Sequence, residues 1–245
     1  MTATPSLHLY DSFTGPTLDQ ARWRFLEYPL DDRTWVCREE DAETRVADGA
    51  LSIRVARFRN AHPWHQNVDN CKHLLLATDT VPVGTTGRTM FCAEIRAENL
   101  DGTPYDYRDG FVSFNVLDFA TGMVFDVCAT SDRVIAIYER LPLPHVTDPF
   151  TYIVDAPLSG VTIAPGRWYT CAVMFDPAAR TAEWTVDGCR VFAAREVDVP
   201  AAVTLGVGFI TLHPVRDGRS HSLRGQGLAG GWRNVGVAYA EDVAR

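Results

Sequence analysis

The densest group of residues suited to proton transfer or ligand contact lies between His62 and His73. Three histidines and one tryptophan fall within these twelve residues, together with Lys72. Histidine exchanges protons near neutral pH, and the flat face of tryptophan packs against a sugar or a polyene. We expect Trp64 and His65 to contact a ligand, and Lys72 and His73 to act as acid–base groups.

The same segment has two other interpretations. It could be an ordinary structured loop without a ligand. His62, His65 and Asp69 also have the side chains of metal ligands, but nothing in the sequence fixes a helix or strand that would bring them together. We therefore predict neither a metal nor a cofactor.

Polar residues also interrupt apolar runs in the middle of the chain. Ser113 and Asn115 alternate with Phe114 and Val116, so they share one face of a strand while the apolar pair packs on the other. A polar side chain in an apolar strand must meet solvent, a partner or a ligand. We expect Ser113 and Asn115 to bind substrate.

Asp126 and Tyr138 lie on the next two apolar runs and are candidate catalytic residues. If these runs pair as hairpins, both side chains share the face of Asn115, and His73 enters from the side. Alternatively, Asp126 is a structural carboxylate paired with an arginine such as Arg133. A slip of one residue in the pairing would reverse every face, and the sequence does not fix that pairing.

His213 ends an apolar run and opens a glycine-rich segment, and we expect it to contact substrate. The glycines of this segment do not have the spacing of a phosphate-binding loop followed by a helix. Nucleotide binding is therefore not expected.

The elements that must position these residues are short strands. Alternating runs bounded by Gly, Pro, Asp and Asn recur from end to end, and only the stretch 18–26 has room for a turn or two of helix. This pattern predicts antiparallel sheets packed face to face. The expected strands cover residues 7–13, 34–38, 44–47, 50–57, 72–80, 88–98, 110–118, 122–129, 132–140, 150–156, 167–176, 181–187, 189–196, 202–213 and 230–240.

Two segments resemble a known family. They are Asp11-Ser12-Phe13-Thr14-Gly15, followed later by Ala47-Asp48-Gly49-Ala50-Leu51, and the hairpin Trp184-Thr185-Val186-Asp187-Gly188. Together they resemble the opening strand and a late hairpin of concanavalin A-like jelly rolls, which include legume-type lectins and laminarinase-type glucanases. The resemblance implies one all-β jelly-roll sandwich of two antiparallel sheets over residues 1–245. Its concave sheet would form a cleft in which relatives hold sugars.

Laminarinase-type glucanases place three carboxylates, Glu-x-Asp-x-x-Glu or Glu-x-Asp-x-Glu, on a central strand of that cleft. The central strand here carries Ser113 and Asn115 without such a motif. One literal match exists, at Glu39, Asp41 and Glu43, but it precedes the second major strand. We expect these three side chains to be exposed and dispensable.

Composition restricts partners and location. A formal net charge of −8 argues against binding to nucleic acid or anionic lipid, and no run of 18 apolar residues exists to span a membrane. The N-terminus lacks the features of a signal peptide, and the six cysteines contain no C-x-x-C pair. We expect a cytoplasmic protein with reduced thiols, and the composition suggests a bacterial source.

We interpret the chain as a cofactor-independent enzyme of small-molecule metabolism, such as a cyclase, isomerase or lyase of biosynthesis. The alternatives are a non-catalytic carbohydrate-binding protein and a divergent glycoside hydrolase. The expected partner is a small molecule or carbohydrate, and the oligomeric state stays open. Two titratable groups that converge on an apolar pocket would favour catalysis, whereas a shallow aromatic groove would favour a lectin.

Overall fold

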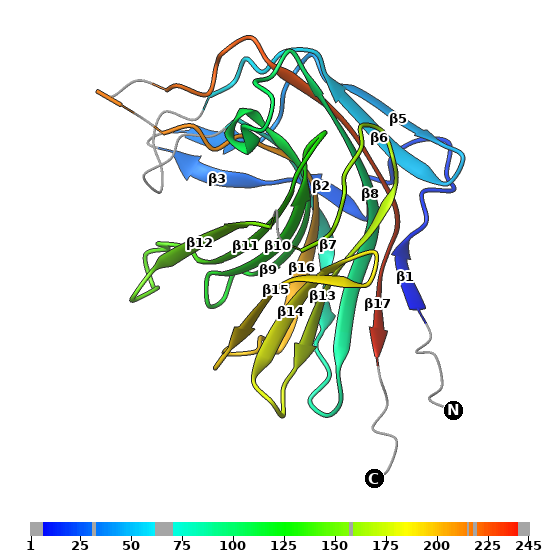
Figure 1. Ribbon diagram of the computed structural model, residues 1–245, viewed down its shortest axis with the longest axis vertical. Coiled ribbons are helices and arrows are strands. Elements are labelled where there is room, and N and C mark those ends of the chain that lie inside the picture. Colours follow the sequence, from blue (N-terminus) through cyan, green and yellow to red (C-terminus); the bar gives the residue numbers. More distant parts are fainter. Residues whose placement is uncertain are drawn as a thin grey trace.

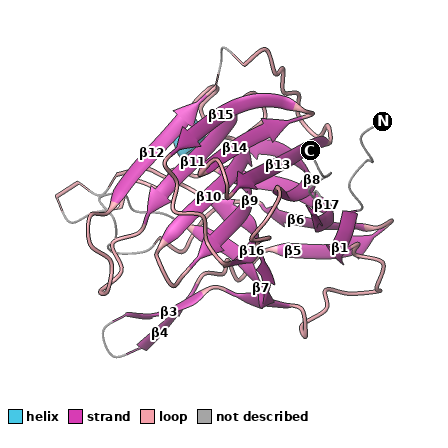
Figure 2. Cartoon of the chain, turned by 90° about the horizontal axis from the view of Figure 1, so that it is seen from below, coloured by secondary structure: helices cyan, strands magenta, loops and turns pink. Residues whose placement is uncertain are grey.

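The computed structural model of the protein describes residues 7–30, 33–61, 71–156, 159–214, 216–217 and 220–239. Over these residues the regular structure is β-strand, apart from one short 3-10 helix, η1 (Tyr107–Asp109). Two large antiparallel sheets pack on each other (Figures 1 and 2). This architecture confirms the predicted all-β jelly-roll sandwich.

The first sheet has eight strands, in the order β15, β14, β13, β8, β17, β6 and β5, with β1 paired to β17. Because β1 and β17 are neighbours, the two ends of the described chain lie close together (Figure 1). The strands are β1 (Leu7–Asp11), β5 (Glu43–Ala47), β6 (Ala50–Val55), β8 (Thr89–Leu100), β13 (Tyr169–Asp176), β14 (Thr181–Val186), β15 (Cys189–Arg195) and β17 (Gly227–Tyr239).

The second sheet has seven strands, in the order β12, β11, β10, β9, β16, β7 and β2. They are β2 (Trp23–Phe25), β7 (Lys72–Pro82), β9 (Phe111–Asp118), β10 (Met123–Ala129), β11 (Val134–Arg140), β12 (Phe150–Asp155) and β16 (Ala202–Ile210). A separate hairpin of β3 (Glu27–Leu30) and β4 (Arg33–Val36) projects beside this sheet (Figure 2).

The main core lies between the two sheets. Phe114 and Val116 point into it from β9, as predicted, and meet large side chains such as Trp184 and Trp232 of the other sheet. Full burial of a valine or phenylalanine side chain stabilises the fold by roughly 1.5–3 kcal/mol. The indole nitrogen of Trp232 also donates to the Ser113 carbonyl at 2.9 Å, which ties the two sheets together.

A second apolar cluster covers the outer face of the seven-stranded sheet. It includes Leu74, Leu117 and Ile137, and the hairpin residues Tyr28 and Trp35 pack against it. The hairpin therefore helps to enclose this outer face, which corresponds to the predicted cleft.

Aspartate–glycine pairs close two of the predicted hairpins. Asp48 and Gly49 join β5 to β6, and Asp187 and Gly188 join β14 to β15. All four residues have positive φ, between 48° and 75°. Type I′ turns need this conformation at both central positions, which is why the sequence signal was reliable.

The expected helix at 18–26 forms only one turn. The Trp23 nitrogen donates to the Asp19 carbonyl at 2.9 Å, and β2 then begins. The Trp23 side chain is buried, and its indole nitrogen donates to Asp11 Oδ2 at 2.7 Å. This tertiary anchoring outweighs the local helical tendency.

Among the described residues, no helix is long and apolar enough to cross a membrane. All six cysteines are free thiols; Cys189 is exposed and the other five are buried.

Candidate functional site

An apolar pocket of about 90 Å³ lies on the outer face of the seven-stranded sheet. Four polar side chains enter it: Lys72, Asn115, Asp126 and Glu139. A mainly hydrophobic lining with a few convergent polar groups is typical of small-molecule sites. The apolar walls are Leu26, Leu74, Leu117, Phe119, Val124, Ile137, Leu141, Ile210 and Leu212.

Strand pairing determines which polar residues share the pocket. Asn115 of β9 lies opposite Asp126 of β10, and directly opposed residues project from the same face of a sheet. On β11, Ile137 lies opposite Asp126, and Glu139 is two residues further along that face. Two carboxyl groups and an amide from three adjacent strands therefore gather at one place.

No ion pair of Asp126 is found among the described residues, although the charge of Lys72 in the same pocket lowers its pKa in part. Asp126 is only 3% exposed, and its Oδ1 has no hydrogen-bond partner within the described part of the chain. Burial raises the pKa of Asp126 well above its usual value, and the charge of Glu139 raises it further. Arg133, the partner expected if Asp126 were structural, binds Asp155 instead. The environment of Asp126 therefore favours its protonated form, which is the form that a proton donor requires.

Glu139 has a different environment. Burial raises the pKa of Glu139, whereas the hydroxyl of Thr151, which donates to Oε1 at 2.7 Å, and the charge of Lys72 lower it. Lys72 is the only lysine in the chain. Lys72 lowers the pKa of both carboxyl groups, but only Glu139 also accepts a side-chain hydrogen bond among the described residues, so its charged form has more support.

Asn115 is held in place by its neighbours. Its Nδ2 donates to Ser113 Oγ at 3.0 Å, and that hydroxyl donates to the Gly208 carbonyl at 3.1 Å. Gly206 lies opposite Asn115, and a Cβ added there would come within 3.1 Å of the Asn115 Cβ. Asn115 therefore faces the pocket as predicted. Ser113 orients Asn115 through this hydrogen bond, but Ser113 does not line the pocket.

The predicted placement of His73 in this cleft is wrong. Adjacent residues of a strand point to opposite faces, and Lys72 already faces the pocket. His73 points instead toward the space between the sheets, where its ring lies edge-on to Phe25 at 5.1 Å. Burial lowers the pKa of His73 to about 4, so this side chain is neutral near pH 7 in the folded protein.

The predicted placement of Tyr138 is wrong for a related reason. Tyr138 lies opposite Phe125, not Asp126, so it belongs to the core side of β11. Its ring packs against that of Phe125 with centres 5.5 Å apart. Of the four predicted catalytic residues, the structure brings Lys72 and Asp126 together.

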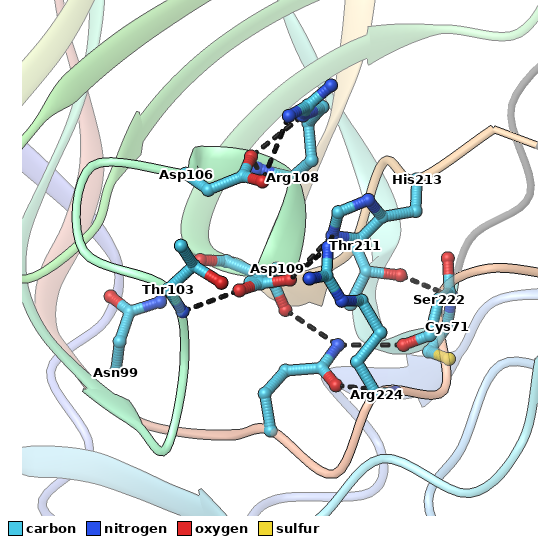
Figure 3. Close-up of polar contacts among 12 residues, drawn as sticks. Cys71, Asn99, Thr103, Asp106, Arg108, Asp109, Thr211, His213, Ser222 and Arg224 are labelled. Carbon is cyan, nitrogen blue, oxygen red and sulfur yellow. Dashed lines mark hydrogen bonds and ion pairs between the residues drawn. The ribbon is translucent and has the colours of Figure 1, made fainter.

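The remaining predicted contacts lie elsewhere. Trp64 and His65 fall outside the described residues. His213 follows the pocket residue Leu212, but it does not line the pocket. Its Nε2 donates to Oδ1 of the buried Asp109 at 2.5 Å (Figure 3).

Of the three carboxylates in the glucanase-like match at residues 39–43, two are exposed and one is buried. Asp41 and Glu43 are exposed at the surface, as predicted. Glu39 is only 2% exposed, which contradicts the prediction. Its two carboxylate oxygens accept the backbone N–H groups of Arg59 and Asn60, each at 3.0 Å. These partners are about twenty residues away, so no local pattern signals them.

Glu139 was not among the predicted site residues. The alternation of Ile135, Ile137 and Glu139 indicates that the three share a face. The alternation alone does not show which face this is. The pairing of β11 with β10 puts it on the side of Asp126, and the sequence leaves that pairing open.

A family model described as a family of unknown function (DUF6081) matches residues 10–241. No curated protein matches the sequence. Among solved structures, LamA from Z. galactanivorans, in complex with laminaritriose and laminaritetraose, is similar with a TM-score of 0.61 and 12% identity. The match covers 96% of this chain and 100% of that chain.

Two further solved structures have the same fold. An endo-1,3-beta-glucanase from Streptomyces sioyaensis matches with a TM-score of 0.58 and 14% identity, over 96% of this chain and 95% of that chain. The Emp47p carbohydrate recognition domain matches with a TM-score of 0.55 and 12% identity, over 96% and 97%. At these identities the likeness establishes the fold alone, and that fold is the concanavalin A-like jelly roll.

Proposed function

Because this chain belongs to the DUF6081 family and has the fold of glucanases and a lectin domain, we propose that it acts on a carbohydrate-type ligand in the pocket around Asp126. The reaction is hydrolysis of a glycosidic bond by a pair of carboxyl groups. One observation carries this proposal: Asp126 and Glu139 share an apolar pocket, and burial raises the pKa of Asp126 well above its usual value.

In the proposed reaction Asp126 is the general acid. It gives its proton to the oxygen of the bond that breaks, while a water molecule attacks the anomeric carbon. Glu139 accepts the proton released by that water, and Lys72 favours the ionised form of Glu139 beforehand. Asn115 hydrogen-bonds a ligand hydroxyl, and the aliphatic walls contact the C–H face of the sugar ring.

On the strand positions of Asp126 and Glu139 we propose inversion at the anomeric carbon. Diagonal neighbours on adjacent strands are about 7–8 Å apart at the backbone. Inverting enzymes separate their carboxyl groups by about 6.5–9.5 Å, whereas retaining enzymes separate them by about 5 Å. A separation in the wider range would leave room for water between the sugar and Glu139.

A second function is supported by the lining of the pocket. The walls are mostly aliphatic, and Phe119 is the one aromatic ring among the described lining residues. Such a wall also suits acid-catalysed cyclisation or isomerisation of a mainly apolar small molecule, with Asp126 again as the proton donor.

The first test is the Asp126→Asn variant. Because asparagine has the shape of the protonated acid but cannot donate the proton, we expect turnover to fall about 10²- to 10⁴-fold while ligand binding changes little. Glu139→Gln should lower turnover similarly, and Glu98→Gln, on the exposed face of the other sheet, is the matched control. Activity would be followed on laminari-oligosaccharides and aryl glycosides, with NMR of the anomeric product.

The outcomes separate the candidates. Turnover of glycosides that depends on Asp126 supports hydrolysis, and an inverted product supports the water-mediated route. Saturable sugar binding without turnover in the unaltered protein would favour a lectin. No sugar binding, with saturable binding of apolar ligands that alters the titration of Asp126, would favour the second candidate.

A further inference from the structure

A polar hollow of about 430 Å³ lies where the chain after β16 meets η1. Figure 3 shows three of its lining residues, Arg108, His213 and Arg224, around Asp109. Arg108, Arg216 and Arg224 line it, together with His213 and His221. None of these residues takes part in the reaction proposed above. The protein as a whole has a formal net charge of −8, so this cationic lining differs from the molecule's average character.

Buried hydrogen bonds build the floor of the hollow. His213 donates to Asp109 Oδ1, and their side chains are 5% and 2% exposed. The backbone nitrogen of Thr103 donates to Asp109 Oδ2 at 2.6 Å, and Gln226 Nε2 donates to the Asp109 carbonyl at 3.1 Å. These bonds fix the position of His213 before any ligand arrives.

The arginines have donors to spare above this floor. Arg224 Nη1 lies 3.6 Å from Asp109 Oδ1, and Arg108 donates to both oxygens of Asp106 at 2.7 and 3.0 Å. Both side chains are about half exposed, and a guanidinium has five N–H donors. No residue of the described chain pairs with Arg216, which is exposed.

A metal ion suits the same place less well. Ligand atoms of Asp106, Asp109 and His213 lie within 4.8 Å of one another, which is a metal-like grouping. However, Arg108 already binds Asp106, and Arg224 lies against Asp109. A cation would have to enter between two guanidinium groups, whereas an anion would meet them with opposite charge.

We propose that this hollow binds an oxyanion group, a phosphate, sulfate or carboxylate, through the guanidinium groups of Arg108, Arg216 and Arg224. Planar guanidinium donors match the oxygens of such groups in charge and geometry. The glycine-rich chain around Arg216 lacks the spacing of a nucleotide-binding loop, so side chains and not backbone amides supply the donors.

The site stands apart from the function proposed above, because it does not need Asp126 or Glu139. Leu212 lines the carboxyl pocket and His213 lines the hollow, so the two sites are consecutive along the chain. The oxyanion would be either a free ion or an acidic group of a larger ligand, and the titration below distinguishes the two.

The test is calorimetric titration at low ionic strength with inorganic phosphate, sulfate, glucuronate and glucose. We expect saturable binding of the anions, weakened about tenfold or more by Arg216→Gln and by Arg224→Gln. Arg216 has no partner among the described residues, so its variant should unfold at the unchanged temperature. Arg190→Gln, an exposed arginine on β15, is the control and should bind phosphate normally.

Tighter binding of glucuronate than of phosphate would assign the anion to a saccharide substituent, and equal binding would assign it to a free ion. Normal phosphate binding by Asp126→Asn would separate this site from the pocket. Three results would overturn the proposal: no saturable anion binding, equal weakening by Arg190→Gln and Arg216→Gln, or binding of Ca²⁺ or Mg²⁺ that depends on Asp109 in place of anion binding.

Discussion

Single buried side chains have two distinct kinds of role in this protein. Asp126 is buried next to a pocket that can admit a ligand, and its raised pKa makes it a proton donor. His73 is buried but does not line that pocket, and its Nδ1 accepts the backbone N–H of Glu39 at 3.1 Å. Burial alone therefore does not identify a catalytic group; contact with accessible space is also required.

His73 should make the stability of the protein depend on pH. Its pKa is lowered to about 4 in the folded state, against about 6.5 when unfolded, so the unfolded chain binds more protons between these values. Lowering the pH from 6.5 to 4 should reduce the free energy of unfolding by an amount on the order of 3 kcal/mol. Urea unfolding across this pH range measures the effect.

The contribution of His73 is isolated by His73→Gln, which cannot take up the proton. Between pH 6.5 and 4, the free energy of unfolding of this variant should change much less with pH than that of the unaltered protein, whatever the variant's stability at pH 7. His8→Gln, in the exposed part of β1, should retain the original slope. An unchanged slope in His73→Gln would mean that His73 is protonated in the folded protein.

At the level of elements, Glu39 connects segments that strand pairing leaves separate. Its carboxylate binds the chain just after β6, and its own N–H binds β7 through His73. The Asn60 side chain completes the connection by donating to the Arg38 carbonyl at 3.0 Å. The turn that follows the β3–β4 hairpin is therefore fixed against two strands of different sheets.

Replacing Glu39 with Gln should destabilise the fold. The backbone N–H groups of Arg59 and Asn60 each need an acceptor, and glutamine has only one oxygen to accept a hydrogen bond. Its NH₂ group would face the other N–H, so two donors would meet. The free energy of unfolding should fall by about 1–3 kcal/mol. Glu40→Gln is the matched control, because the Glu40 side chain is 76% exposed and should contribute little. Equal stabilities by chemical denaturation would show that Glu39 is dispensable.

At the level of the whole molecule, the two packed sheets control access to the thiols. Five cysteines are buried and Cys189 is exposed on β15. Burial raises the pKa of Cys92 to about 11, and it raises the pKa of Cys128 as well. Since the thiolate is the reactive form, buried thiols should react only when the sandwich opens.

We therefore expect one fast-reacting thiol in the native protein and six after denaturation without reductant. A thiol-specific reagent that produces a coloured product measures both numbers. Cys189→Ser should remove the fast phase and leave the slow reaction unchanged. Fewer than six thiols after denaturation would reveal disulfides, and several fast thiols in the native state would show that the sheets open readily.

The sequence by itself was sufficient for the architecture. Alternation of apolar and polar residues, Asp–Gly turns and the absence of helical periodicity all concern neighbours in the chain, and all favoured an antiparallel sandwich. The same alternation correctly placed Asn115 on the face of β9 that points away from the core. It also made Asp126 a pocket candidate, because a carboxyl among apolar strand residues needs an explanation.

The composition of the site was decided only by the tertiary structure. A strand has a period of two, so the choice between Lys72 and His73, or between Tyr138 and Glu139, depends on a register that no local pattern contains. Glu39 became structural because its partners come from a segment twenty residues away. Asp109 and His213 meet across 104 residues of chain. Such contacts form only when the two sheets pack together, and they are stabilised by the burial of the whole core and not by local sequence.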